Sequence, residues 1–324
     1  MKAFVLAAGL GTRLRPFTEM IPKPLMPVLN VPSLFYTLFQ LKRAGIHDII
    51  CNIHHHADLV MRAVYEARIP GLSITFSEEP VILGTGGGLK KCEKLLAGEF
   101  FVLVNSDIVT DLDIMAMVRH HRAAGRPATL ALYATPRAAS IGSVGIVGDR
   151  IVDFANRCRS GLSSSFIYTG TAVLGPEIFR YLAECHSSIV DTGFLGLIDH
   201  GGIGWYEHRG FWVDIGTMQQ YWEANMDRDG RIASFGDAMR SNLLCAPHRL
   251  ADDAVLAADV EQGNSVFGSA CRIGAGSKLV DSVILPGVEV PPWTELRGAI
   301  VGRHAISFVS SNAKKQDNYG TERT

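Results

Sequence analysis

The chain has 324 residues, enough to bury a large core, and as a prior this length indicates two domains. Its 31 Lys and Arg nearly balance its 32 Asp and Glu, which argues against a general binder of nucleic acid or of membrane surfaces. A small anionic ligand held by a few local cations remains compatible with this balance.

The six cysteines are scattered and form no C-x-x-C pair. We interpret them as reduced, mostly buried thiols of a cytoplasmic protein rather than as a disulfide or zinc framework. The apolar residues 3–8 run directly into a glycine loop, so we expect no secretory signal. No apolar run approaches the roughly 20 residues that a membrane span requires.

Strand-like and helix-like segments alternate through the first 225 residues. The pattern predicts strands over 4–8, 48–53, 72–76 and 100–104, and helices over 32–44, 57–67 and 89–96. Alternation of this kind with continuous apolar strands indicates an α/β fold with a doubly wound, mostly parallel (Rossmann-like) sheet. Ligands of such sheets bind beyond the carboxyl ends of the strands, where the loop at Gly9 and the segment 105–107 lie.

The last quarter of the chain has a different period. From residue 266 onward apolar residues recur six apart, in two phases: Phe267, Ile273, Leu279 and Leu285, and then Ile284, Val290 and Leu296. This hexapeptide period predicts a short left-handed β-helix in preference to a meander of short strands. We therefore expect a catalytic domain over 1–238, a linker and β-helix over 239–309, and a polar, disordered tail over 310–324.

The segment 9–24 reads G-L-G-T-R-L-R-P-F-T-E-M-I-P-K-P. Gly9 and Gly11 permit positive φ angles and let backbone N–H groups close on an anion. Arg13 can offer a planar fork to two phosphate oxygens, and Lys23, between two prolines, supplies a compact charge on a stiff backbone. A G-x-G after a strand is by itself more typical of a tight turn than of a phosphate site, and the third glycine of a dinucleotide fingerprint is missing.

The whole string, however, resembles the signature of the sugar-phosphate nucleotidylyltransferases, the NDP-sugar pyrophosphorylases. The resemblance continues at L-G-T-G-G-G over 83–88, at Asp107, and at G-F-W-V-D-I-G-T over 210–217. It covers nearly all of the first 225 residues. It implies an enzyme that uses a nucleoside triphosphate and a sugar 1-phosphate, and neither nucleic acid nor membrane as partner.

The resemblance also implies that Asp107 and Asp214 hold Mg²⁺, a cation that takes one or two protein carboxylates and completes its shell with phosphates and water. A sugar 1-phosphate oxygen would attack the α-phosphorus in line, and pyrophosphate would leave. Arg13, Lys23 and Asp107 are the expected catalytic residues. Asp111 and Asp113 are better explained as caps of the following helix or as solvated carboxylates, and three consecutive histidines at 54–56 cannot converge on one metal without a bend.

The remaining expected contacts fall into two groups. The nucleotide is expected to contact Leu6, Ala8, Gly9, Gly11, Thr12, Arg13, Glu79, Gly84, Thr85 and Gly86. The sugar phosphate is expected to contact Asn156, Arg157, Thr169 and Gly170. The chain departs from the family at this second group, since F-A-N-R-C over 154–158 stands where many members have F-x-E-K-P. A plain surface loop explains Asn156 and Arg157 equally well.

The short hexapeptide region and the G-T-G-G-G loop look closest to the mannose-1-phosphate guanylyltransferase-like branch. We expect GTP and mannose 1-phosphate, with a uridylyltransferase for N-acetylmuramate 1-phosphate or another sugar 1-phosphate as the alternative. A second alternative is a non-catalytic, nucleotide-sugar-binding regulatory homologue. We expect the β-helix to pack on the catalytic domain or to form a subunit contact in a homo-oligomer, because its open end exposes strand edges.

Overall fold

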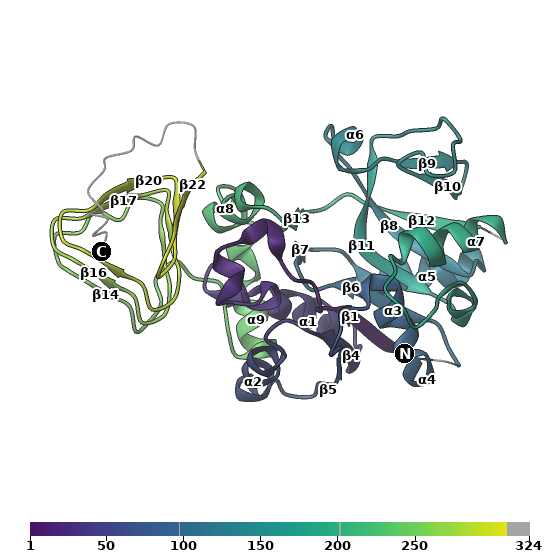
Figure 1. The fold of residues 1–324 in the computed structure, drawn as a ribbon, viewed down its shortest axis with the longest axis horizontal. Helices are drawn as coiled ribbons and strands as arrows, with labels where there is room; N and C mark the ends of the chain where they lie inside the picture. The colour runs from purple at the N-terminus through teal and green to yellow at the C-terminus, as the bar shows by residue number, and fades with distance from the viewer. Residues whose placement is uncertain (97, 201, 310–324) are drawn as a thin grey trace. The chain divides into compact units, whose positions relative to one another are not determined.

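The computed structural model describes residues 1–96, 98–200 and 202–309, and the predicted tail over 310–324 lies outside them. The chain divides into two compact units. Unit 1 comprises Met1–Leu10, Pro22–Pro24 and Leu34–Trp212, and unit 2 comprises Gly11–Ile21, Leu25–Ser33 and the chain from Val213 onward (Figure 1). The predicted boundary at 238 lies within unit 2, and the functional domain limits stay predictions.

Unit 1 is built on a nine-stranded sheet. All of its strands run in one direction except β10 and β11, so the predicted α/β fold with a mostly parallel sheet is confirmed. In spatial order the strands are β5 (Ser73–Glu78), β4 (Asp48–Ile53), β1 (Lys2–Leu6), β6 (Phe101–Asn105), β11 (Phe166–Leu174), β8 (Ala128–Ala134), β12 (Ile203–His208), β10 (Arg150–Phe154) and β9 (Val144–Val147).

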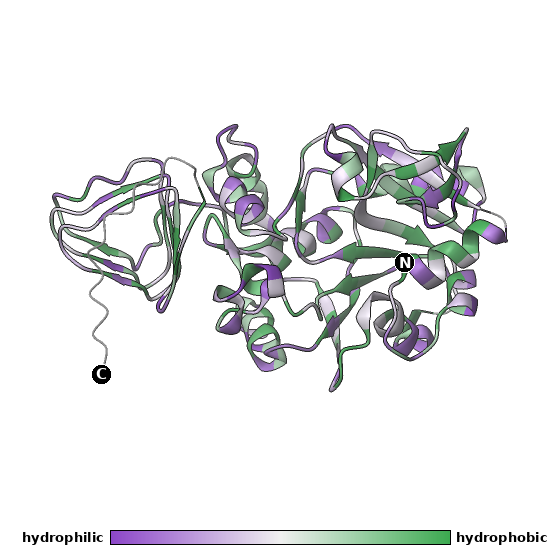
Figure 2. Cartoon of the chain, turned by 45° about the horizontal axis from the view of Figure 1, so that its top comes forward, coloured by the Kyte–Doolittle hydropathy of each residue, from purple (hydrophilic) through white to green (hydrophobic). Residues whose placement is uncertain are grey.

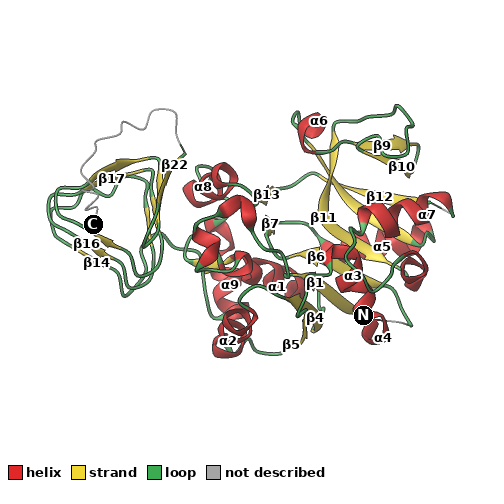
Figure 3. Ribbon diagram, viewed as in Figure 1, coloured by secondary structure: helices red, strands yellow, loops and turns green. Residues whose placement is uncertain are grey.

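Helices connect these strands, as Figure 3 shows. They are α1 (Ser33–Arg43), α2 (Ala57–Ala67), α3 (Gly84–Lys91), α4 (Glu93–Leu96), α5 (Ile114–Ala124), α6 (Ala138–Ile141) and α7 (Leu195–Asp199), with 3-10 turns η3 (Lys23–Leu25) and η4 (Pro176–Tyr181) and a π turn η5 (Val190–Phe194). The predicted strand 48–53 and helix 57–67 are confirmed at both ends. The predicted helix 89–96 is wrong at its start, because the glycine cluster before it is itself helical.

The core of unit 1 is apolar on both sides of the sheet. Phe4, Leu103 and Leu130 are completely buried in neighbouring strands, and the hydrophobic colouring of the strands in Figure 2 follows the same layer. Of the cysteines, all free, Cys51, Cys92 and Cys271 are buried whereas Cys158 and Cys185 are exposed, so the prediction of mostly buried thiols holds for half of them. Among the described residues, no helix combines the length and the apolar character that spanning a bilayer requires.

The order of the strands fixes where a ligand can bind. From β1 the chain proceeds to β4 and β5 on one side, and then returns to β6 on the other side of β1. Leu6, the last residue of β1, is paired with Asn52 of β4 and with Asn105 of β6. The carboxyl ends of three strands therefore meet at the point where the winding reverses, which is where doubly wound sheets open a crevice.

Unit 2 contains short elements from two stretches of the chain, one before residue 34 and one after residue 212. They are the 3-10 turns η1 (Thr12–Leu14), η2 (Phe17–Glu19) and η6 (Ala233–Phe235), the hairpin β2 (Pro27–Val28) and β3 (Val31–Pro32), and helices α8 (Met218–Met226) and α9 (Gly236–Leu243). The hairpin is tied to α8 by two buried side chains. The amide oxygen of Asn225 accepts from the N–H of Leu29 at 3.0 Å, and the Tyr221 hydroxyl donates to the carbonyl of Pro27 at 2.7 Å.

The rest of unit 2 consists of short strands stacked in parallel ladders. The strands are β14 (Val255–Leu256), β15 (Val266–Phe267), β16 (Arg272–Ile273), β17 (Lys278–Val280), β18 (Val283–Ile284), β19 (Glu289–Val290), β20 (Glu295–Arg297), β21 (Ala299–Val301) and β22 (Ile306–Phe308). Partners lie 17 residues apart, as in Val255 with Arg272, and as the bond from the N–H of Ala299 to the Ser282 hydroxyl also shows. The stacking begins at β14, earlier than the predicted 266.

The side chains that the hexapeptide period predicted to point inward are buried. All seven, from Phe267 to Leu296, are less than one tenth exposed. The last strand differs from the others, because β22 pairs with β21 in the antiparallel sense. It occupies the edge that the ladder of β15, β18 and β21 would otherwise leave open.

Candidate active site

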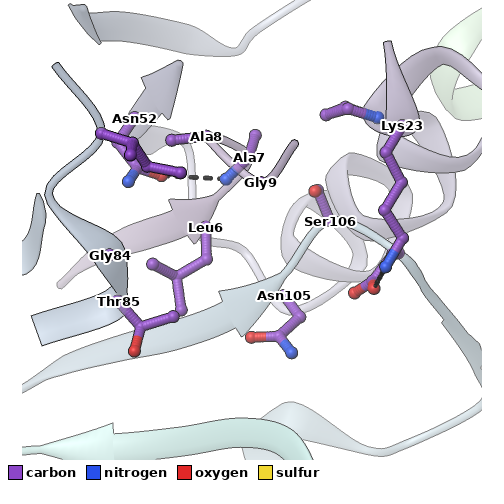
Figure 4. Close-up of a pocket in the computed structure, with 13 residues that line it drawn as sticks. Leu6, Ala7, Ala8, Gly9, Lys23, Asn52, Gly84, Thr85, Asn105 and Ser106 are labelled. Atoms are coloured by element: carbon purple, nitrogen blue, oxygen red, sulfur yellow. Dashed lines mark hydrogen bonds and ion pairs between the residues drawn. The ribbon is translucent and has the colours of Figure 1, made fainter. Parts of the chain in front are cut away.

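A pocket opens at the carboxyl edge of the unit 1 sheet, at the reversal point described above (Figure 4). We refer to it as the edge pocket. The loop after β1 contributes Ala8 and Gly9, and the end of β6 contributes Asn105, Ser106 and Asp107. The start of α3 contributes Gly84 and Thr85, and Lys23 enters from the segment 22–24. Every contributing segment except the last is the continuation of a strand or the start of a helix, so a rigid scaffold positions the pocket.

Lys23 and Asp107 form an ion pair inside this pocket. The Lys23 ammonium donates a short hydrogen bond to Oδ2 of Asp107, and the two side chains are 14% and 16% exposed. At that burial each charge compensates the desolvation of the other, and removal of either would leave an uncompensated charge. An incoming phosphate could replace the carboxylate as the partner of the lysine, and a cation could replace the lysine as the partner of the carboxylate.

Asn52 and Glu79 brace the pocket from behind. The amide oxygen of Asn52 accepts from the N–H of Ala7 at 2.9 Å, and its nitrogen donates to Glu79 at 2.7 Å. The other carboxylate oxygen of Glu79 accepts from the N–H of Leu83 at 2.8 Å. Since both of its oxygens are engaged and it is 1% exposed, Glu79 fixes the start of α3 to the loop after β1 and does not line the pocket.

The glycines of α3 pack closely against the segment 185–188. Gly84, with φ of +67°, lines the edge pocket and also contacts this segment, since a β-carbon there would lie 2.5 Å from the carbonyl oxygen of Ser187. Gly86 and Gly87 are buried against the same segment. A β-carbon on Gly86 would lie 2.5 Å from the Ser187 hydroxyl, and one on Gly87 would overlap the carbonyl oxygen of Cys185. The glycine cluster is thus required for close packing of α3 as well as for access to the pocket.

Unit 2 holds the other predicted phosphate and metal residues. Gly11, with φ of +63°, starts the turn η1, on which Thr12 and Arg13 are exposed. A β-carbon on Gly216 would lie 2.8 Å from Nη2 of Arg13 and 2.8 Å from Oδ1 of Asp214. The two charged groups are therefore neighbours, and the missing side chain of Gly216 leaves the space in which they meet.

The predicted sugar-phosphate residues lie elsewhere in unit 1. Arg157 forms an ion pair with Asp191, and both side chains are 45% exposed. Asn156 has φ of +60°, and its amide oxygen accepts from the N–H of Gly161 at 3.0 Å. The hydroxyl of Thr169 donates to the carbonyl of Ala131 at 2.9 Å in the buried part of β11.

The predicted residues of unit 1 therefore separate into two groups. Those that line the edge pocket are Leu6, Ala8, Gly9, Lys23, Gly84, Thr85 and Asp107. Those that do not line it are Glu79, Gly86, Asn156, Arg157, Thr169 and Gly170. A β-carbon on Gly170, which has φ of +84°, would lie 2.7 Å from the amide nitrogen of Asn105 in the pocket wall. The roles of both groups stay predictions.

Six pocket residues were not among the predicted contacts: Ala7, Pro24, Asn52, Ile82, Asn105 and Ser106. Asn52 carried a signal, since it is the one polar residue in the apolar run 49–53. Asn105 and Ser106 precede Asp107 at the end of a buried strand, and the edge position alone could have marked them.

The ionisable side chains limit which metals the site could hold. Within residues 1–96, 98–200 and 202–309, no three His, Cys, Asp or Glu side chains gather closely enough to bind a metal ion. A site with few protein carboxylates suits Mg²⁺, which relies on phosphate and water oxygens, better than it suits zinc. The half-buried Asp107 carboxylate in the edge pocket has this oxygen-only chemistry.

Asp113 behaves as the predicted helix cap, since its carboxylate accepts from the N–H of Ala116 at 2.8 Å at the start of α5. His54 lies next to Glu79, with Nδ1 2.6 Å from the carbonyl oxygen of that residue. Among the described residues it belongs to no cluster of metal-binding side chains.

Comparison with known proteins gives a family match over most of the chain. A family model described as "Nucleotidyl transferase" matches residues 2–230. A rice protein (Oryza sativa subsp. japonica) named "Probable mannose-1-phosphate guanylyltransferase 1" is 28% identical over 314 residues, which are 94% of this chain and 84% of that protein. The UTP–glucose-1-phosphate uridylyltransferase of Synechocystis is 33% identical over 245 residues, 69% of this chain. This chain spans 62% of the length of that relative.

Among solved structures, UDP-glucose pyrophosphorylase from Acinetobacter baumannii superposes with a TM-score of 0.63 at 19% identity. The match covers 75% of this chain and 98% of that one. At this level of identity the likeness concerns the fold alone, and it agrees with the α/β sheet described above.

Proposed function

The chain belongs to the nucleotidyl transferase family, and on that premise we propose that it transfers a nucleotidyl group from a nucleoside triphosphate to a sugar 1-phosphate, with release of pyrophosphate. The observation that carries the proposal is the Lys23–Asp107 pair in a pocket at the reversal point of the sheet. Its position is the one at which doubly wound sheets bind ligands, and its charges suit a reaction between phosphates.

In this reaction a sugar 1-phosphate oxygen forms a bond to the α-phosphorus while the bond to pyrophosphate breaks. Both reactants are polyanions, so catalysis consists mainly of alignment and neutralisation of charge. Lys23 would exchange its carboxylate partner for phosphate oxygens as the reactants enter. Gly9, which lines the edge pocket, would offer its backbone N–H group to a phosphate oxygen.

Arg13 would bind the departing pyrophosphate with its planar fork. Gly216 supports this role within unit 2, because only a residue without a side chain leaves Arg13 and Asp214 their present positions.

Mg²⁺ would be held by Asp107, with Asp214 as the second predicted ligand. When bound, it would neutralise phosphate charge and orient the α-phosphate. The donor set supports this choice, since each residue offers carboxylate oxygens and no nitrogen or sulfur ligand accompanies Asp107 in the edge pocket.

For the substrates we propose GTP and mannose 1-phosphate. The support is the name of the rice relative, which matches both the catalytic region and most of the stacked strands. A uridylyl reaction is the alternative, favoured by the Synechocystis relative. We propose further that Arg157 receives the sugar phosphate, which would displace Asp191 from its half-exposed ion pair.

The test of the reaction is pyrophosphate release across a grid of nucleoside triphosphates and sugar 1-phosphates, with and without Mg²⁺. We expect one strong combination that requires Mg²⁺. Lys94→Ala and Asp58→Ala, at exposed positions of α4 and α2, are the matched controls for Lys23→Ala and Asp107→Ala. Saturable binding of a nucleotide sugar with no release in any combination would instead identify a non-catalytic regulatory homologue.

The sugar-phosphate assignment has its own test. Arg157→Ala should raise the KM for the sugar 1-phosphate about tenfold with little change in the KM for the triphosphate. Asp191→Ala should lower the former KM, because it removes the competing carboxylate. Arg159→Ala, at an exposed position in the same loop, is the control. Equal KM values for the sugar 1-phosphate in the wild type and the three variants would show that Arg157 is a surface residue that does not bind the sugar phosphate.

The stacked strands are proposed to form a left-handed β-helix. The 17-residue offset, the three ladders and the buried apolar period support this assignment. An experimental density map would read the hand of the coil directly. The cytoplasmic location and the oligomeric state stay predictions.

A further inference from the structure

Unit 2 contains a second cavity, of about 360 Å³, which the proposed reaction does not use. One wall is the segment 16–21 that follows the turn η1. The other wall is contributed by Leu285 and Pro286 and by the segment 302–305 of the last turn of the stacked strands. We refer to it as the coil cavity. Its size is within the range of small-molecule sites.

Two exposed basic side chains lie at this cavity, Arg303 and His304. Within the part of the chain that the structure describes, neither forms a hydrogen bond or an ion pair. The guanidinium of Arg303 lies against the backbone of Gly287, where a β-carbon would overlap it. Gly287 has φ of +67°, so a larger residue would be strained there and would displace the fork. The arginine is thus positioned without any acidic partner among the described residues.

The remaining lining is largely apolar. Phe17, Met20 and Ile21 contribute from one wall, and Leu285 and Pro286 from the other. Met20 is 47% exposed, and together with the other apolar residues of the cavity it offers a surface on which the body of a ligand could pack. Glu19 also lines the cavity, so a ligand with negative charge at both ends would meet repulsion. The lining suits a molecule with one anionic group and an apolar body.

The position of the coil cavity along the chain connects it to the proposed chemistry. The wall 16–21 lies between Arg13 and Lys23, the two cations assigned to the substrate phosphates. A ligand that orders this wall would restrict the backbone on both sides of it, and a preordered segment loses less conformational entropy when substrate binds. Occupancy should therefore favour binding of the triphosphate.

We propose that the coil cavity is a regulatory site for a phosphate monoester with an apolar body, bound through Arg303 and His304, and that its occupancy lowers the KM for the nucleoside triphosphate. The binding step stands on the cavity alone, whereas the effect on KM rests on the proposed function.

The binding step is tested by calorimetric titration of the full chain with phenyl phosphate. Inorganic phosphate and benzoate serve as probes of the anion alone and of a carboxylate in its place. We expect phenyl phosphate to bind at least tenfold more tightly than inorganic phosphate and than benzoate. Arg303→Ala should weaken it about tenfold or more, whereas Lys23→Ala and Arg297→Ala should not. Arg297, exposed on β20 and outside the cavity, is the matched control.

A thermal unfolding curve for each variant separates loss of binding from loss of the fold, and Arg303→Lys should recover part of the affinity. Equal binding by wild type and Arg303→Ala, or loss of binding in Lys23→Ala, would overturn the site. Tighter binding of benzoate would overturn the phosphate assignment.

The regulatory step is measured as the KM for the triphosphate with and without phenyl phosphate. We expect a decrease of at least about threefold that Arg303→Ala abolishes, with the kcat and KM of the ligand-free variant unchanged. Binding at the cavity with an unchanged KM would overturn the regulatory role. Absence of turnover in every condition, with binding intact, would count against the proposed function and not against the site.

Discussion

The sheet of unit 1 and the stacked strands of unit 2 bury apolar side chains in opposite ways. In the sheet, neighbours such as β1 and β6 are about a hundred residues apart, and the edge where they end gathers residues from five separate segments. In the stacked strands each residue meets the one 17 positions along the chain. Convergence of distant segments creates a pocket for chemistry, whereas regular local stacking creates a long surface with repeated structure.

This contrast predicts that the largest losses of activity follow changes at the sheet edge. Asp107→Ala and Lys23→Ala should each lower kcat/KM for pyrophosphate release about 10²- to 10³-fold, because each removes a preorganised charge from the edge pocket. Thermal unfolding should show that both variants fold. Retention of more than a third of wild-type activity by either variant would remove the edge pocket from the reaction.

A second test addresses the part of the proposed chemistry that belongs to unit 2. Gly216→Ala would place a methyl group against the flexible ends of Arg13 and Asp214, which can move aside at little cost to the fold. We expect kcat to fall about tenfold with an unchanged unfolding midpoint. Gly236→Ala is the control, since a β-carbon there would meet no described atom within 4 Å and its φ of −49° suits alanine. If kcat is unchanged, the present positions of Arg13 and Asp214 do not matter for turnover.

Glycine substitutions should lower the unfolding free energy of the sheet and of the stacked strands independently of each other. Gly87→Ala would force α3 away from Cys185, and Gly274→Ala would push Pro292 out of the stacked strands. Overpacking of this kind costs about 1–3 kcal/mol of unfolding free energy. In calorimetry we expect two transitions, with Gly87→Ala lowering one and Gly274→Ala the other. Only Gly87→Ala should also reduce turnover, and a shared shift of one transition would show that the regions unfold together.

The smallest expected effect concerns pH. Burial on α5 lowers the pKa of His121 below its usual 6.5, with the charges of His120 and Arg122 acting in the same direction and that of Glu177 opposing them. Between the two pKa values, His121 therefore binds a proton in the unfolded chain and is neutral in the folded chain. The resulting stabilisation is complete above pH 6.5 and is lost as the pH falls toward the folded-state pKa.

We expect the unfolding midpoint of the wild type to decrease between pH 7.5 and 5.5, by roughly 2–4 °C more than that of His121→Gln. His186→Gln, at an exposed position outside α5, should retain the wild-type slope. Parallel slopes in all three proteins would contradict the assignment to His121.

Sequence reasoning succeeded where local pattern determines structure. The strand 48–53, the helix 57–67 and the buried period after 266 follow from apolar spacing alone. The motif residues Lys23 and Asp107 lie together in the edge pocket, and their catalytic roles stay predictions. It failed where distant contacts decide. The glycines at 84–88 look like a loop, yet packing against the segment 185–188 makes them helical. The reversed direction of β11 and the pairing of Arg157 with Asp191 likewise depend on segments far apart in the chain.

The antiparallel strand β22 limits where the stacked strands can gain or lose residues. Because β22 covers β21 in the ladder of β15, β18 and β21, a strand added after it could not continue this ladder by pairing with β21. An insertion or deletion of one 17-residue repeat between β15 and β21 would keep every side chain in phase, whereas any other length would rotate apolar residues into water. Natural relatives should therefore differ here by whole repeats placed ahead of a retained final strand.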